Sequence, residues 1–288
     1  MKKHFFPLFL LVLAGLACNL PFSSGAVPPT VLPVASSVPT VSLPASAPTP
    51  TLPVATAGGF AVSLSSSLAE GYLLEVVPEV SDENAAGPWS IAPAHLLIRL
   101  PNYPLQGKFH EPRLVIYPVS SLIEMNEGAA YNFKRLQEIL GAGGGVPASP
   151  QDLPGVFFFN AGGLFVSNLS RLPFQNGQGI RWLTEYAQYF APVNNFELFY
   201  LYQGLSQDQN FYVIAVLPVM HPALAMDDNP NAALPPGGIP YPAEDWSQAE
   251  EYYRQVGNLL ENTPPDSFTP RLSDLDALIA SLNVSPAP

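Results

Sequence analysis

The chain has 288 residues, with 11 Lys and Arg side chains against 23 Asp and Glu, which gives a formal net charge of -12 at pH 7. Nucleic acids and anionic lipid headgroups are held by clustered Lys and Arg, so this charge balance argues against both as partners. The chain also contains 34 prolines and a single cysteine, and both bear on where the protein resides.

The N-terminus has the pattern of an export signal. Lys2 and Lys3 precede an apolar run over residues 5–16, which is shorter than the ~20 apolar residues of a membrane-spanning helix. The run leads into Ala14-Gly15-Leu16-Ala17-Cys18, and this stretch resembles the lipobox of bacterial lipoproteins. The resemblance implies a signal peptide over residues 1–17, cleavage before Cys18, and acylation of Cys18.

Cys18 is the only cysteine, and a lone cysteine in an exported protein is free, paired between chains or modified. Modification at the end of the apolar run accounts for it most simply. Two or three acyl chains anchor a protein stably, since each buried methylene contributes about 0.8 kcal/mol. We therefore expect a bacterial membrane lipoprotein, anchored through Cys18 and facing the extracytoplasmic side. A plain secretory signal with an incidental cysteine is the alternative.

Residues 18–58 form a low-complexity segment that is rich in Pro, Ser, Thr, Val and Ala and has no charged side chain. Closely spaced prolines remove amide donors and fix φ, so an extended polyproline II chain is favoured over helix and sheet. The sequence predicts a disordered linker here, followed by a single folded domain over residues 59–288.

Strand and helix patterns alternate irregularly along this domain. Ser121 and Glu124 have the spacing of a capping box, which predicts a helix that ends at Gly141. Two further helices are predicted over residues 244–261 and from Ser273. Alternating apolar residues predict strands over residues 71–77, 95–100, 113–119, 156–159, 164–166, 196–203 and 211–217. The last four pair as two hairpins, one over residues 156–166 and one over residues 197–217.

The second hairpin is apolar on both faces. Tyr200 and Tyr202 share one face of its first strand, and Phe199 and Leu201 share the other. A strand of this kind lies inside a sheet that is covered on both sides. The predicted class is therefore α+β, with a mainly antiparallel sheet covered by helices in an α-β-α sandwich-like arrangement.

Sequence patterns for catalysis are mostly missing. There is no Gly-x-Ser-x-Gly motif, and His95, His110 and His221 do not have the HExxH spacing of zinc hydrolases. The glycine cluster over residues 141–145 lacks the Lys-Ser/Thr of a phosphate-binding loop and is interpreted as a helix stop. No cofactor is predicted.

Two stretches are candidate binding sites. Asp227, Asn229 and Asn231 have the spacing of EF-hand oxygen ligands, but the loop lacks the later Gly and Glu, so calcium is a weak candidate. An aromatic-rich stretch predicts a groove on which sugar rings stack, with packing in the core as the alternative. Its candidate ligand-binding residues are Trp182, Tyr186, Tyr200 and Tyr202.

Two functional hypotheses follow. The first is a non-enzymatic lipoprotein, attached to the membrane by its lipid, whose domain binds an envelope protein, a glycan or another ligand. The second is an anchored hydrolase that acts on envelope or extracellular glycans through a carboxylate pair such as Glu185 and Glu197. The tract over residues 176–205 resembles uncharacterised bacterial lipoprotein domains, a resemblance that implies no activity.

Overall fold

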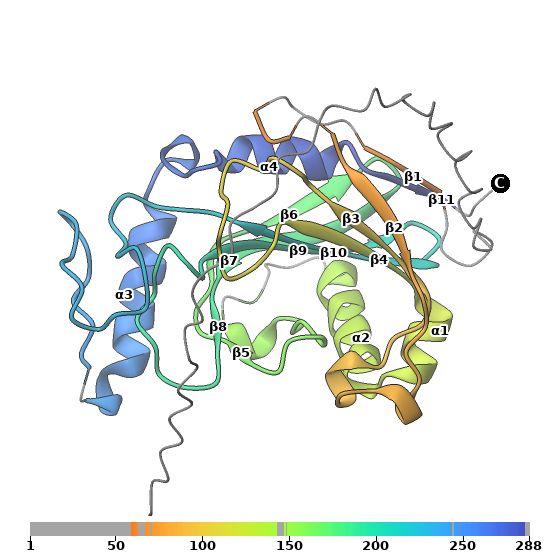
Figure 1. Ribbon diagram of the computed structural model, residues 1–288, viewed down its shortest axis with the longest axis horizontal. Coiled ribbons are helices and arrows are strands. Elements are labelled where there is room, and N and C mark those ends of the chain that lie inside the picture. The colour runs from red at the N-terminus through yellow and green to blue at the C-terminus, as the bar shows by residue number, and fades with distance from the viewer. Residues whose placement is uncertain are drawn as a thin grey trace, which may run out of the picture. The chain divides into compact units, whose positions relative to one another are not determined.

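The computed structural model describes residues 59–62, 67–69, 71–142, 147, 149–243 and 245–285. The predictions for the signal peptide, Cys18 and the proline-rich linker lie outside these residues. The described residues form an α+β fold with a sheet of seven antiparallel strands and four α-helices (Figure 1). This confirms the predicted class and the antiparallel sheet.

The elements have the following bounds. In spatial order the large sheet contains β2 (Leu73–Val77), β3 (His95–Arg99), β4 (Arg113–Pro118), β10 (Phe211–Pro218), β9 (Phe199–Ser206), β7 (Gly177–Thr184) and β6 (Ser167–Phe174). Two short ladders pair β1 (Gly59–Ala61) with β11 (Asn283–Ser285) and β5 (Gly162–Gly163) with β8 (Tyr186–Ala187). The α-helices are α1 (Val119–Met125), α2 (Glu127–Gly141), α3 (Ala249–Glu261) and α4 (Leu272–Ala280). The short 3-10 helices are η2 (Asp82–Asn84), η3 (Pro88–Ser90), η4 (Pro150–Asp152), η5 (Trp246–Gln248) and η6 (Pro265–Ser267).

The hairpin of β9 and β10 forms the middle of the sheet, as predicted. Every residue of both strands is buried. Its turn is held by Asp208, whose Oδ1 accepts hydrogen bonds from Ser206 Oγ at 2.6 Å and from the Asn210 N–H at 3.1 Å. An Asp side chain that bonds to the backbone two residues later stabilises a tight turn. This explains why the polar residues 206–209 can connect two strongly apolar strands.

Each face of the sheet has its own hydrophobic cluster. One cluster contains Tyr200, Tyr202 and apolar residues of α3 and α4, and the other contains Phe199, Leu201 and apolar residues of α1 and α2. Figure 1 shows α4 and the α1–α2 pair on opposite sides of the sheet. None of the helices in the described part of the chain has the length and apolar character needed to cross a membrane.

The first predicted hairpin is wrong. Phe157 and Phe158 lie in a turn, and residues 164–166 form an irregular link between β5 and β6. The strands that the prediction missed are β6 and β7. Pro173 and several polar residues weaken the strand pattern of β6, which the fold tolerates because β6 is an edge strand.

The single helix predicted over residues 121–141 is divided in two. Asn126 ends α1 and caps α2, where its Oδ1 accepts the Ala129 N–H at 2.9 Å. Its Nδ2 also donates to the carbonyl oxygens of Pro88 and Ile91. Ser121 therefore lies inside α1 rather than capping a helix. The predicted helix over residues 244–261 forms as α3, but its first turn is the 3-10 helix η5.

Two glycines make room for a tyrosine ring inside the sheet. Gly179 of β7 lies opposite Gly204 of β9. A Cβ atom on either glycine would lie 2.4 Å from the hydroxyl oxygen of Tyr202. That hydroxyl donates to the Leu172 carbonyl oxygen at 3.2 Å, so the ring crosses both positions.

We expect Gly179→Ala to lower the free energy of unfolding by about 1–3 kcal/mol, because the added methyl group overpacks a rigid site. Urea denaturation followed by circular dichroism measures this change. Gly71→Ala is the control, since a Cβ atom there meets no atom within 4 Å. Equal losses of stability in the two variants would contradict the idea that Gly179 is needed to make room for the Tyr202 ring.

Candidate functional site

The four aromatic residues predicted to bind a ligand lie in the core instead. Trp182, Tyr186, Tyr200 and Tyr202 are at most 9% exposed. Tyr200 donates its hydroxyl hydrogen bond to Asp276 at 2.9 Å, and Tyr202 donates to Leu172. Sequence periodicity places Tyr200 and Tyr202 on a strand correctly, but strand interiors favour the same residues as sugar-binding surfaces. They therefore do not form an exposed stacking platform.

The calcium candidate is an exposed loop whose side chains are used locally. The Asp227 Oδ1 accepts the Asn229 N–H at 3.2 Å, and the Asn229 Oδ1 accepts the Asn231 N–H at 3.0 Å. These Asx turns account for the spacing of the three residues without a cation. Within the described ranges, no group of three or more His, Cys, Asp and Glu side chains is placed to hold a metal.

Glu185 and Glu197 do come together, because both accept hydrogen bonds from Asn194. Glu185 is fully buried, and Asn194 links the pair by donating its N–H to Glu185 Oε2 at 3.0 Å and its Nδ2 to Glu197 Oε2 at 2.8 Å. Burial is the main cause that raises the pKa of Glu185, and the Glu197 charge raises it further. Glycosidases keep their carboxyl groups roughly 5 Å or more apart across the scissile bond. Asn194 instead holds this pair together from one side, and Glu185 has no solvent-exposed surface from which to act on a glycan.

A different group of residues has the features of a binding site, and Arg113 is at its centre. Arg113 is the first residue of β4, where it lies opposite Arg99 of β3. It is in phase with Val115 and Tyr117, which pack in the cluster on the α1–α2 side of the sheet. The strand therefore directs an arginine side chain toward an apolar face.

The guanidinium of Arg113 has no partner. Its Nε is sealed from solvent without a hydrogen-bond acceptor. No ion pair or side-chain hydrogen bond of Arg113 occurs anywhere in the described part of the chain. Arg99, by contrast, pairs with Glu75 at 3.6 Å and with Glu111 at 2.6 Å. Native proteins nearly always pair a buried cation, so an unpaired one marks a place where an anion fits.

A continuous arc of aromatic rings surrounds this guanidinium. The Arg113 Cζ lies 5.4 Å from the ring centre of Phe158 and 5.9 Å from that of Phe159. From Phe159 the arc extends to His110, stacked at 4.7 Å, and in the other direction through Phe158 to Phe157. These cation–π contacts hold the guanidinium in place without neutralising its charge.

The arc ends in polar atoms that also lack partners. Phe157 contacts Tyr117 at 5.2 Å between ring centres, and Tyr117 contacts His95 at 4.5 Å. Tyr117 is 4% exposed, His110 is 8% exposed and His95 is 9% exposed. Among the described residues, no hydrogen bond reaches the Tyr117 hydroxyl or either ring nitrogen of His110. Of the polar side-chain atoms in this arc, only the Arg113 Nε is sealed from solvent without a partner, so the other polar groups lie at an edge that water reaches.

The electrostatics follow from burial. Burial, and next the Arg113 charge, lower the pKa of His110 to about 4, so its ring is neutral at physiological pH. Burial likewise lowers the pKa of His95 and raises the pKa of Tyr117. Burial also lowers the pKa of Arg113, but a guanidinium stays charged in proteins. The site therefore combines the Arg113 charge with neutral hydrogen-bonding groups, beside the ion pair of Arg99 and Glu111.

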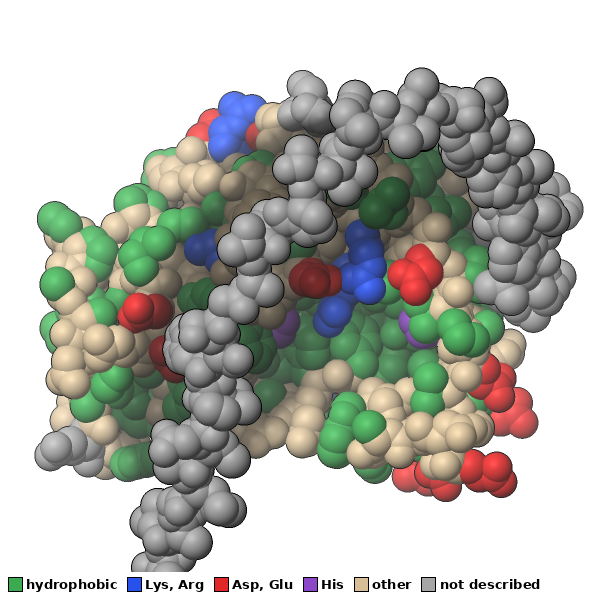
Figure 2. Space-filling model, in the orientation of Figure 1, with side chains coloured by type: hydrophobic (Ala, Val, Ile, Leu, Met, Phe, Trp, Pro, Cys, Tyr) green, Lys and Arg blue, Asp and Glu red, His purple; other side chains and the backbone are tan. Residues whose placement is uncertain are grey.

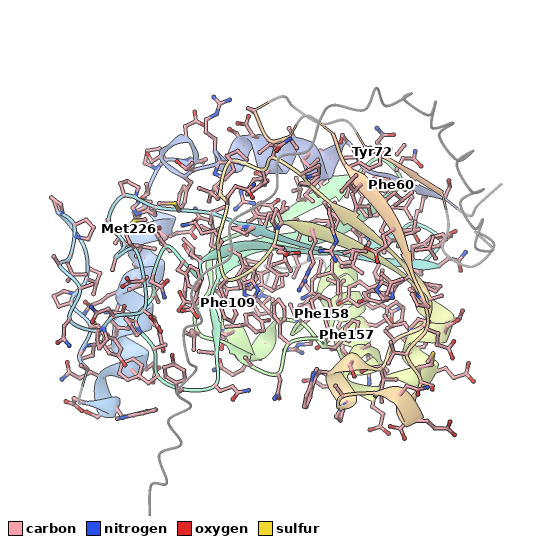
Figure 3. All side chains as sticks on the ribbon, in the orientation of Figure 1. Phe60, Tyr72, Phe109, Phe157, Phe158 and Met226 are labelled. Carbon is pink, nitrogen blue, oxygen red and sulfur yellow. The ribbon has the colours of Figure 1, made fainter. Side chains whose placement is uncertain are left out.

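The pictures agree with this placement. In Figure 2, basic, acidic and histidine side chains gather in the hollowed middle of one face, with hydrophobic side chains beneath them. Figure 3 places Phe157 and Phe158 side by side below the sheet, on the side of α1 and α2, with Phe109 nearby. Phe157, Phe158 and Phe159 are only partly buried, so the arc is open on one side.

The sequence contained one signal for this site. Arg113 begins an apolar strand in phase with Val115 and Tyr117, and a charge in phase with buried positions is unusual. The three adjacent phenylalanines were predicted as part of a strand, so the prediction did not show that they line the Arg113 site. This arrangement can bind an anion between the Arg113 guanidinium and the faces of the neighbouring aromatic rings.

We find no family model that matches this chain, and no curated protein and no solved structure that is similar to it.

Proposed function

We propose that this protein is a membrane-anchored, extracytoplasmic bacterial lipoprotein whose α+β domain binds an anionic ligand at Arg113. The observation that supports binding is the unpaired, partly buried guanidinium beneath Phe158 and Phe159. The lipobox pattern that ends at Cys18 supports the anchor. An α-β-α sandwich is the finer architecture that we propose, because each face of the sheet packs against its own helices.

A non-enzymatic role is favoured over the hydrolase alternative. Glu185 is fully buried, and both it and Glu197 accept hydrogen bonds from Asn194 instead of flanking a groove. Arg113 makes no ion pair with a carboxylate in the described part of the chain. Such a site suits retention of an anion, because the charge complementarity is fixed before the ligand arrives.

Thermal denaturation of the full chain with phosphate, sulfate, acetate and benzoate tests anion binding. A ligand at 100 times its Kd stabilises the folded state by about 2.7 kcal/mol, which raises the melting temperature measurably. We expect at least one anion to stabilise the wild-type protein and Arg99→Met, but not Arg113→Met. Equal stabilisation of all three proteins would show non-specific salt effects and would refute the site.

Cys18→Ser tests the anchor separately. We expect the variant to leave the membrane fraction or to remain unprocessed, because the acyl chains that hold the protein are attached to this thiol. Cell fractionation and the mass of the mature N-terminus provide the readout. Normal processing with unchanged membrane partition would refute lipidation while leaving the anion site untouched.

A further inference from the structure

A cavity that contains no residue of the Arg113 site lies between the end of α2 and the tips of two hairpins. Its volume is about 520 Å³, which is within the range of pockets that hold small ligands. Gln137, Leu140 and Gly141 of α2 form one wall. The ends of the β6–β7 and β9–β10 hairpins form the rest, through residues 173–178, 205–207 and 209.

The floor of this cavity is a row of three side chains on one face of the sheet. Gln178 of β7 lies opposite Pro173 of β6 and opposite Leu205 of β9. Residues paired across an antiparallel ladder share a face, and Leu205 belongs to the hydrophobic cluster that includes residues of α2. The Gln178 amide is therefore flanked by apolar side chains on the α2 side of the sheet.

The cavity is rich in side-chain amides, and none of the described residues that line it is charged. Asp208 lies in the adjacent turn, but its carboxylate accepts hydrogen bonds from Ser206 and Asn210 and does not line the cavity. An amide offers both a donor and an acceptor without a net charge. The lining therefore suits a neutral ligand whose own groups also donate and accept. The six amide residues are Gln137, Gln175, Asn176, Gln178, Gln207 and Gln209.

Two of these amides are used by the fold. Gln175 donates from Nε2 to the Ser281 carbonyl oxygen at 3.0 Å and accepts from Asn283 Nδ2 at 3.2 Å. The Asn176 side chain is bonded to both the N–H and the carbonyl oxygen of Val284. These bonds hold the β6–β7 turn against the C-terminal segment, so this wall of the cavity is in place before a ligand arrives.

The other four amides can bind a ligand. Gln137 Nε2 donates to Gln209 Oε1 at 2.5 Å, which leaves the Gln137 oxygen as an acceptor and the Gln209 nitrogen as a donor. Gln178 and Gln207 are exposed, and neither side chain is hydrogen-bonded to another described residue. Exposed amides are hydrated, so a ligand here exchanges hydrogen bonds with water and breaks none that the fold needs.

We infer that this cavity binds a neutral oligosaccharide. Sugar hydroxyl groups donate and accept as the amides do, and the C–H face of a sugar ring can pack on the exposed Pro173 and the half-buried Leu140. An extended peptide fits less well, because it pairs with a strand edge and Pro173 offers no N–H on the edge strand β6. The inference goes beyond the proposed anion binding and does not depend on it, since Arg113 does not line the cavity.

Titration calorimetry of the full chain with four neutral trisaccharides tests the inference. Cellotriose, maltotriose, mannotriose and tri-N-acetylchitotriose differ in glycosidic configuration, in hydroxyl orientation and in the acetamido group. We expect at least one to bind the wild-type protein. One hydrogen bond corresponds to roughly three- to tenfold in affinity, so the double variant Gln178→Ala/Gln207→Ala should bind it roughly ten- to a hundredfold more weakly. The melting temperature of this variant should not change, because both side chains are exposed.

Gln255→Ala is the matched control, since it removes an exposed glutamine from α3, outside the cavity. This control and Arg113→Met should bind the trisaccharide as the wild-type protein does. Failure of all four trisaccharides to bind would overturn the inference, and so would equal affinity for the wild type and the double variant. Binding of acetylated and amidated tri-alanine in place of any trisaccharide would also overturn it. Each of these outcomes leaves anion binding at Arg113 untouched, because that site is tested with anions.

Discussion

Arg113→Met should stabilise the domain and abolish anion binding at the same time. The Arg113 Nε loses hydration on burial and gains no acceptor, whereas methionine is an apolar side chain that adapts to the faces of Phe158 and Phe159. We expect the free energy of unfolding to rise by about 1–3 kcal/mol in a buffer with a bulky, weakly binding anion. Urea denaturation measures the rise.

Arg99→Met is the matched control for this prediction. It removes the same charge from the neighbouring strand position, but it breaks exposed ion pairs with Glu75 and Glu111. Such pairs contribute about 0–1 kcal/mol, so a small loss of stability is expected with anion binding retained. If Arg113→Met instead destabilises the protein by more than the control, Arg113 is a structural support for the aromatic arc and not a binding residue.

Glu185→Gln should raise the melting temperature at pH 8 and flatten its dependence on pH. The folded protein keeps the Glu185 proton because burial raises the pKa of its carboxyl group. The unfolded chain loses that proton above pH ~4.3. The stability that this group contributes is therefore complete at low pH and is lost as pH rises, by about 1.4 kcal/mol for each pKa unit between the two states.

The glutamine keeps the shorter hydrogen bond, since its amide oxygen accepts the Asn194 N–H, and it loses only the long one from Asn194 Nδ2 at 3.4 Å. The difference in melting temperature between variant and wild type should grow steadily from pH 5 to pH 8. Glu79→Gln, at an exposed position after β2, should show no such trend. A constant difference across this range would mean that Glu185 is ionised in the folded protein.

His110 adds the opposite dependence. Its pKa of about 4 in the folded protein is lower than that of an unfolded histidine, so the stability it contributes is complete above pH ~6.5 and is lost as pH falls toward 4. Between pH ~4.3 and ~6.5 the two slopes oppose each other, so the stability of the wild-type protein should change little there and fall above pH ~6.5. The pH dependence of stability should be compared between the wild-type protein and Glu185→Gln. Both proteins contain His110, so the difference between them reports the Glu185 carboxyl group alone.

The parts of the fold that could be predicted from sequence are those with strong local patterns. The β9–β10 hairpin and α4 were predicted because their apolar residues recur at the period of the element. The break at Asn126 could not be predicted, because the side chain that divides the helix is bonded to carbonyl groups about 35 residues away. β6 and β7 were missed because Pro173 and Gly179 have local preferences that tertiary pairing overrides.

The candidate site was harder to predict for the same reason. Its residues come from β3, β4 and the segment between α2 and β5, which are distant in sequence and meet only through the sheet register. Composition drew attention to the aromatic stretch that includes Trp182 and Tyr200, because residue type alone does not distinguish a core ring from a binding ring. The informative property of Arg113 is the absence of a partner, and that is visible only in three dimensions.

The pairing of β1 with β11 has a mechanical consequence if the domain is anchored through Cys18, as we propose. Phe60 lies opposite Val284, so the first and last described strands are held together by a ladder of three residue pairs. A pull on the N-terminal tether reaches this ladder before any strand of the large sheet. Short ladders at chain ends open at much lower free energy than core strands. If the chain is anchored through Cys18 as we propose, this ladder opens first under load, and the seven-stranded sheet and the Arg113 site stay intact.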